Sequence, residues 1–251
     1  MKTHLTHNIL LNAVAPVTVN VIGVGGNGAQ MISHLARINR CLLELGHSGL
    51  HVCAFDNDEI EEINIGRQLY SQAEVGENKA ISYIEKINRH YGLAWDAMPF
   101  NFESNMGVEA PANITISCVD TVKARQSVFN SFIVLQDEAK THHHQKPLYW
   151  MDLGNGKDQG QVILATVYDQ HHKQPLINVL EMFPDMLDTE DLKTPSCSMA
   201  QSLQQQSLFI NSILCGYAGN LLMDLFTKVR MDYHGYFVNL ESGKSSKVAI
   251  R

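Results

Sequence analysis

Short apolar runs alternate along the chain with longer segments in which apolar residues recur every three or four positions. The runs at residues 17–23, 50–55 and 114–119 are rich in Val, Ile and Leu, which is typical of strands buried on both faces of a sheet. The segment from residue 28 to about 45 and the segment 79–91 carry the helical spacing. This alternation predicts an α/β protein with a Rossmann-like, mostly parallel sheet flanked by helices.

The second half of the chain is less regular. A helix is expected from about residue 121 to 139, a polar loop over 181–198, and the most apolar helix over 203–226. Further strands are expected at 95–100, 147–153, 160–167 and around 236–240, with a glycine-rich link at 154–160. We expect antiparallel strands to be added to the sheet in this half, and residues 1–251 to form a single domain.

Composition and charge exclude several classes of protein. The 251 residues are 45% hydrophobic and 18% charged, which suits a folded protein with a full core. Asp and Glu outnumber Lys and Arg by 26 to 19, so charge-driven binding to nucleic acid or to an anionic membrane is not expected. The N-terminus has no signal-peptide pattern, and polar residues interrupt the apolar run at 208–226. The five scattered cysteines fit a reducing cytoplasm without disulfides or a paired-cysteine zinc site.

A glycine-rich loop joins the first buried strand to the helix that follows it. Gly23, Gly25, Gly26 and Gly28 allow a tight turn that brings backbone N–H groups against a phosphate at the helix N-terminus. Asp56 ends the next strand, where a carboxylate accepts hydrogen bonds from a ribose hydroxyl. The loop alone is also compatible with a tight turn that binds nothing, but the whole series favours a nucleotide site.

Polar and cationic residues directly follow the ribose acid. Residues 56–68 include Asp58, Asn64, Arg67 and Gln68, and Lys79 follows shortly after. A nicotinamide dinucleotide needs no such group, because its pyrophosphate rests on the glycine loop. A triphosphate carries more charge and requires side-chain cations. The segment therefore favours ATP.

Asp120 ends a later strand of the predicted parallel sheet. It is expected at the carboxyl edge, where ligands of such folds bind. Phosphates repel a carboxylate unless a divalent cation lies between them, so Asp120 is a candidate Mg²⁺ ligand.

Taken together, these motifs resemble the ThiF/MoeB/E1-like superfamily of ATP-dependent adenylyltransferases, which activate ubiquitin-like and sulfur-carrier proteins. The Pro-Ser-Cys-Ser stretch at 195–198 is most similar to the ThiF-related member of the plasmid-borne PRTRC cassette. The resemblance rests on the glycine loop, Asp56-x-Asp58, Asn64-x-x-Arg67-Gln68, Val75-Gly76 before Lys79, and Asp120 with Arg125 five residues on.

The resemblance implies that the C-terminal carboxylate of a small ubiquitin-like or carrier protein attacks the α-phosphate of ATP. In this scheme Asp56 holds the ribose and Asp120 places Mg²⁺. Asn64, Arg67 and Lys79 contact phosphates, so that catalysis is mostly positioning and charge stabilisation. A homodimer is also implied, and the sheet face together with the apolar helix after residue 198 is its expected interface.

The chain departs from the family pattern in three places. Residues 1–16 hold no Arg-rich segment of the kind that reaches into a neighbouring subunit's ATP site. Thr121 stands where an Asn usually follows the metal-site Asp, and no paired cysteines are present for a zinc site. The first two departures bear on turnover more than on ATP binding.

Cys197 is the cysteine outside an obvious apolar element, and it precedes the long helix. A thiol there is a candidate to attack the acyl-adenylate and form a thioester, or else it is a spacer packed under the loop. The remaining cysteines, Cys41, Cys53, Cys118 and Cys215, are expected to be inert core residues.

Arg125 is expected either to contact ligand or to form an ion pair on a helix surface. The histidines at 142–144, 171 and 172 are expected in solvated loops rather than in a metal site.

Two other functions remain open. An NAD-binding oxidoreductase would share the glycine loop and Asp56, but it would leave Arg67 and Lys79 without a role. A non-catalytic scaffold would keep the nucleotide site and fits the missing Arg segment.

Overall fold

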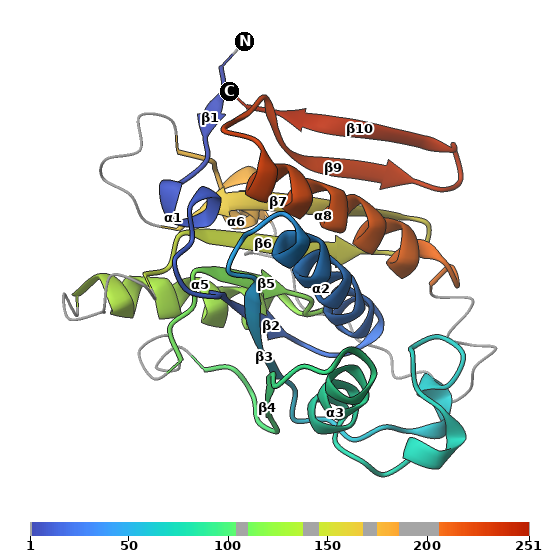
Figure 1. Cartoon of the computed structure of the whole chain (residues 1–251). Coiled ribbons are helices and arrows are strands. Elements are labelled where there is room, and N and C mark those ends of the chain that lie inside the picture. The colour runs from blue at the N-terminus through green and yellow to red at the C-terminus, as the bar shows by residue number, and fades with distance from the viewer. Residues whose placement is uncertain (1, 104–109, 138–145, 168–174, 186–205, 251) are drawn as a thin grey trace.

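The computed structural model describes residues 2–103, 110–137, 146–167, 175–185 and 206–250, and its centre is an eight-stranded sheet (Figure 1). The strand order is β10-β9-β7-β6-β5-β2-β3-β4. These strands are Val17–Ile22 (β2), Leu50–Phe55 (β3), Asp96–Met98 (β4), Ile114–Ser117 (β5), Tyr149–Asn155 (β6), Gln159–Thr166 (β7), Tyr233–Asn239 (β9) and Lys244–Ala249 (β10). β6, β5, β2, β3 and β4 are parallel, whereas β7, β9 and β10 are antiparallel additions, which confirms the predicted fold class.

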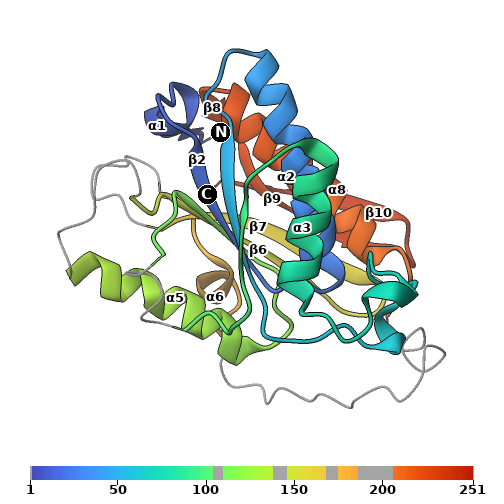
Figure 2. The same cartoon turned by 60° about the horizontal axis from the view of Figure 1, so that its bottom comes forward.

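Helices cover both faces of this sheet (Figure 2). One face carries α2 (Gly26–Glu44), α3 (Lys79–Tyr91) and α8 (Ile210–Thr227), and the other carries α5 (Val122–Asp137) and α6 (Val179–Met182). A large apolar core lies on the first face and a smaller one, around Trp150 and Phe132, on the second. The central strands are therefore buried on both sides, which explains why they read as continuous apolar runs.

The helices α2 and α3 follow directly from the sequence pattern. The apolar stripe of α2, which includes Met31, Leu35 and Leu42, is fully buried against the sheet and α8. α3 begins at Asn78, whose side chain accepts a hydrogen bond from the Ile81 N–H, and it ends at Gly92, where φ is +67°.

The helix expected over 203–226 begins later, at Ile210. Residues 206–209 are not helical, because the Ser207 N–H donates to the Lys157 carbonyl (2.8 Å) and ties the segment to the β6–β7 turn. That turn is also shorter than expected, since residues 154, 155, 159 and 160 belong to the strands. No helix in the described ranges has the length and apolarity needed to cross a bilayer.

The structure adds elements that the sequence pattern did not predict. Near the N-terminus, His4–Leu5 (β1) pairs antiparallel with Arg230–Met231 (β8), and Asn8–Leu11 forms a short helix (α1). Elements of two and four residues are too short to show a hydrophobic period. Residues 186–198 of the predicted loop lie outside the described part of the chain, and α6 occupies its beginning.

Candidate functional site

A cavity of about 670 Å³ opens at the carboxyl ends of β2, β3 and β5. It holds most of the residues predicted for nucleotide binding. Gly28 and Asn64 do not line it, and Cys197 lies outside the described residues. The predicted residues that line it are Gly23, Gly25, Gly26, Asp56, Asp58, Arg67, Gln68, Lys79 and Asp120.

The glycines of the loop have different structural roles. Gly23 has φ of +85° and packs so closely that a Cβ there would lie 2.9 Å from the Cys118 carbonyl oxygen. A Cβ on Gly28 would overlap the carbonyl oxygen of Gly23, so Gly28 lets α2 start directly against the strand. Gly25 faces open space near the Gln68 side chain, which leaves room for a ligand to approach the backbone.

Asp56 fixes the loop from one side and Tyr70 from the other. The Val24 N–H donates to Asp56 Oδ2 (2.6 Å), the Asp58 N–H donates to Oδ1 (2.9 Å), and the Tyr70 hydroxyl donates to the Val24 carbonyl (2.6 Å). Burial raises the pKa of Asp56, although these backbone bonds and Lys79 oppose the shift. Each carboxylate oxygen still has a lone pair that can accept a ribose hydroxyl. The role of Tyr70 was not predicted, because its contact with Val24 joins residues that are distant in sequence.

Lys79 and Arg67 differ in their partners. The buried Lys79 ammonium lies 2.8 Å from Asp58 Oδ2, so this carboxylate already neutralises it. Arg67 Nη2 donates instead to the uncharged Gln206 Oε1 (2.8 Å), just before α8. Burial lowers the pKa of Arg67, as expected for a cation held in a partly desolvated wall. Among the described cavity residues, Arg67 is the cation with no carboxylate partner.

Asn64 and Gln68 lie close together in the sequence, but Asn64 stabilises the turn whereas Gln68 lines the cavity. Asn64 Oδ1 accepts a hydrogen bond from the Glu61 N–H (2.9 Å) and thereby shapes the turn that presents Arg67. The Gln68 amide lines the cavity beside Gly25, and its buried Oε1 has no hydrogen-bond partner. A buried amide oxygen in a cavity wall that has no hydrogen-bond partner among the described residues fits a position that a ligand completes.

Of the two positions expected for Arg125, the surface ion pair is wrong, whereas contact with a ligand stays a prediction. Arg125 lines the cavity, but it is 4% exposed and forms an ion pair with the buried Asp152, with 3.0 Å between Nε and Oδ1. Asp152 was not predicted as a site residue. The available signal was an acid inside the otherwise apolar strand at 149–153, because a fully buried Asp requires a partner.

Only some of the four cysteines that were predicted to be inert core residues lie in the core. Cys215 is buried and Cys53 half-buried, and burial raises the pKa of the Cys53 thiol to about 12. Cys118 lines the cavity, where burial keeps its pKa well above the usual value and its thiol protonated. The expectation for Cys41 was wrong, because it lies exposed on α2.

The predicted histidine loops, residues 142–144, 171 and 172, lie outside the described residues. Within the described ranges, no group of three or more His, Cys, Asp or Glu side chains is placed to hold a metal ion.

Solved structures similar to this chain share its fold. PaaA matches with a TM-score of 0.58 and 16% identity, over 93% of this chain and 64% of PaaA. MccB from E. coli matches with a TM-score of 0.61 and 13% identity, over 96% of this chain and 63% of MccB. The chain thus spans less than two thirds of the length of either protein. No curated protein matches the sequence.

The sequence model of the ThiF family matches residues 7–248. This range includes the glycine loop, the segment that carries Arg67, Asp120 and the antiparallel strands. The chain therefore belongs to the ThiF family.

Proposed function

We propose that this protein binds ATP with Mg²⁺ and transfers the adenylyl group to a carboxylate, the C-terminus of a small ubiquitin-like or carrier protein. One observation carries the proposal. The glycine loop, the cation Arg67 and the carboxylate Asp120 come from separate parts of the chain and line one cavity at the carboxyl edge of the sheet. The N-terminus of α2 also points its positive end at this cavity, which favours phosphate.

The residues present fit a magnesium ion that is held mainly by the nucleotide. Mg²⁺ is commonly bound through one or two carboxylates together with substrate phosphates and water. Asp120 is exposed in the cavity and supplies one carboxylate, while Asp56 is occupied by the glycine loop. Bound there, the ion would neutralise phosphate charge, and Asp120 would hold it.

The proposed reaction forms a bond between a carboxylate oxygen of the partner and the α-phosphorus of ATP. The bond from this phosphorus to the bridging oxygen breaks, and pyrophosphate leaves with the electron pair. The protein residues bind and orient the reactants. Asp56 accepts the ribose hydroxyls, and Arg67 with the N–H groups of the loop binds the phosphates whose charge changes in the transition state.

The structures of similar proteins support a nucleotide and a peptide in this fold. MccB from E. coli has been solved with ATP, and also with MccA. We extend this to the present chain as a proposal, together with the PRTRC-type assignment, a cytoplasmic location and the transfer of the acyl group to Cys197.

ATP–pyrophosphate exchange with candidate partner proteins tests the proposed function. We expect exchange with the wild-type protein. Asp120→Asn should abolish exchange while keeping most of the affinity for ATP, because the lost carboxylate acts through the metal. Asp96→Asn is the matched control, since this exposed acid lies at the far edge of the sheet and pairs with His51. Exchange at the unaltered rate in Asp120→Asn would remove Asp120 from the mechanism.

A further inference from the structure

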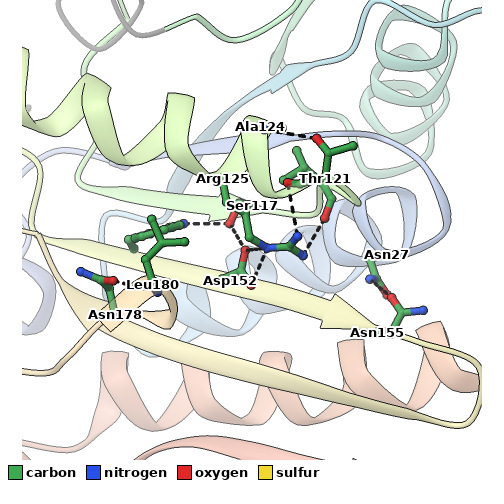
Figure 3. A network of polar contacts seen from close by, with 11 residues as sticks. Asn27, Ser117, Thr121, Ala124, Arg125, Asp152, Asn155, Asn178 and Leu180 are labelled. Carbon is green, nitrogen blue, oxygen red and sulfur yellow. Dashed lines mark hydrogen bonds and ion pairs between the residues drawn. The ribbon is translucent and has the colours of Figure 1, made fainter. Parts of the chain in front are cut away.

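A buried chain of polar side chains lies beneath the segment that carries Asp120 (Figure 3). The Trp150 indole N–H donates to Ser117 Oγ (2.8 Å), and the Ser117 hydroxyl donates to Asp152 Oδ1 (2.6 Å). Arg125 Nε donates to both oxygens of the same carboxylate (3.0 and 3.1 Å). Ser117 and Asp152 are register partners on β5 and β6, so the sheet itself sets their separation.

The other end of the guanidinium holds the backbone on both sides of Asp120. Arg125 Nη2 donates to the Val119 carbonyl (2.8 Å), and Nη1 lies 3.4 Å from the Thr121 carbonyl. Thr121 Oγ1 in turn accepts a hydrogen bond from the Ala124 N–H (3.2 Å) at the start of α5. A single planar side chain thus links the centre of the sheet to the backbone carbonyls of the residues before and after Asp120.

Stability alone does not explain this arrangement. A buried ion pair is seldom more stabilising than apolar residues of the same volume, because both charges lose their hydration. Arg125 also lies in the first turn of α5, where the positive end of the helix dipole disfavours a cation. Asp152 compensates for both costs, and it does so at the wall of the nucleotide cavity.

We propose that Asp152 and Arg125 are positioning residues that fix the 119–121 backbone and thereby hold Asp120 toward the metal and phosphates. This inference rests on the proposed function, since it concerns how the carboxylate of that site is held. Neither residue needs to contact the nucleotide. Asp152 fixes the plane of the guanidinium, and the guanidinium fixes the Val119 and Thr121 carbonyls.

The test measures how much Mg²⁺ gives half-maximal thermal stabilisation of the protein at saturating ATP. Outer-shell partners of a metal ligand contribute about tenfold or more to metal affinity. We therefore expect Asp152→Asn and Asp120→Asn each to need about tenfold more Mg²⁺, and the double variant to need no more than the single ones. The stabilisation by ATP without Mg²⁺ should stay as in the wild type.

Two further variants separate positioning from general destabilisation. Asp224 lies on α8, accepts a hydrogen bond from the Tyr233 hydroxyl and pairs with Lys228. Asp224→Asn removes the charge from both contacts, so it should lower the melting temperature and leave the Mg²⁺ requirement unchanged. Arg125→Lys keeps the charge but cannot bridge two carbonyls and a carboxylate, so it should raise the Mg²⁺ requirement about as much as Asp152→Asn. It also provides the test if Asp152→Asn does not fold. A lower melting temperature with an unaltered Mg²⁺ requirement in Arg125→Lys would overturn the proposal.

Amide hydrogen exchange without nucleotide gives a second, independent readout. Loss of the Asp152 carboxylate should speed exchange in residues 119–125 but not in β2 or β3. Unchanged exchange of 119–125 in both Asp152→Asn and Arg125→Lys would overturn the positioning role. A wild-type protein that ATP and Mg²⁺ do not stabilise would instead overturn the proposed function. In that case hydrogen exchange would still show whether Asp152 and Arg125 fix the backbone of residues 119–125.

Discussion

At the scale of single residues, Arg67 is the cavity residue that we expect to contribute most to phosphate binding. Asp58 neutralises Lys79 and Asp152 neutralises Arg125, whereas Arg67 donates a hydrogen bond to the neutral Gln206. Since no protein carboxylate competes for its guanidinium within the described residues, Arg67 can bind phosphate without breaking an ion pair.

Arg67→Ala should therefore weaken ATP binding about 10- to 100-fold, the usual loss for a hydrogen bond to a charged group. Fluorescence titration with an ATP analogue measures this change. Arg40→Ala is the control, because Arg40 is an exposed arginine of α2 that pairs with Glu44. Equal affinity in Arg67→Ala and Arg40→Ala would show that Arg67 does not bind phosphate.

The carboxylate of Glu74 is expected to make the stability of the protein depend on pH. Burial acts to raise its pKa, but hydrogen bonds from Lys86, Ser71 and Ser82 outweigh this and lower it to about 2. A carboxyl whose pKa is lower in the folded state adds stability at a pH above its unfolded value of 4.5, and loses it as the pH falls toward about 2.

Glu74→Gln should lower the free energy of unfolding by about 1–2 kcal/mol at neutral pH, and the difference should shrink below pH 4.5. Urea unfolding at several pH values measures it. The control variant is Glu44→Gln, because Glu44 is exposed and its ion pair with Arg40 is expected to add little stability. A constant difference from pH 7 to pH 2.5 would show that the Glu74 contacts do not depend on its charge.

At the scale of elements, the glycine loop separates into a part that packs and a part that binds. Gly28→Ala forces a methyl group into the Gly23 carbonyl, and it should destabilise the protein by about 3 kcal/mol or more. Gly25→Ala meets only the Gln68 side chain at 3.8 Å, so the protein should fold normally while the methyl group obstructs phosphate. Thermal unfolding and ATP titration of both variants measure this contrast. Normal ATP affinity in Gly25→Ala would place the phosphates elsewhere.

Elements with a full hydrophobic period were predictable, and those fixed by single contacts were not. β3 and α3 have the predicted bounds because the apolar run in one, and the Asn78 cap and Gly92 in the other, are local signals. The start of α8 depends on the Ser207 bond to the Lys157 carbonyl, which is a long-range contact. The same limit applies to the site: the motif residues were found, but Tyr70 and Asp152 act through partners that are distant in sequence.

At the scale of the whole molecule, α8 packs within its own chain along one side and is exposed along another. Most of its apolar residues pack against α2 and the sheet of the same chain, whereas Ser212, Ile213 and Asn220 are exposed. The homodimer stays a prediction from the family resemblance. Sedimentation velocity at micromolar concentration should show a dimer, and a monomer would contradict it.

Calorimetric titration with nucleotides measures whether the cavity of this molecule is an ATP site. The glycine loop and Asp56 would serve ATP or NAD, but the unneutralised Arg67 and the exposed Asp120 suit a triphosphate with Mg²⁺. Titration with ATP and Mg²⁺ should give saturable heat at one site per chain, and titration with NAD should give none. Saturable binding of NAD, with no heat from ATP, would contradict the account.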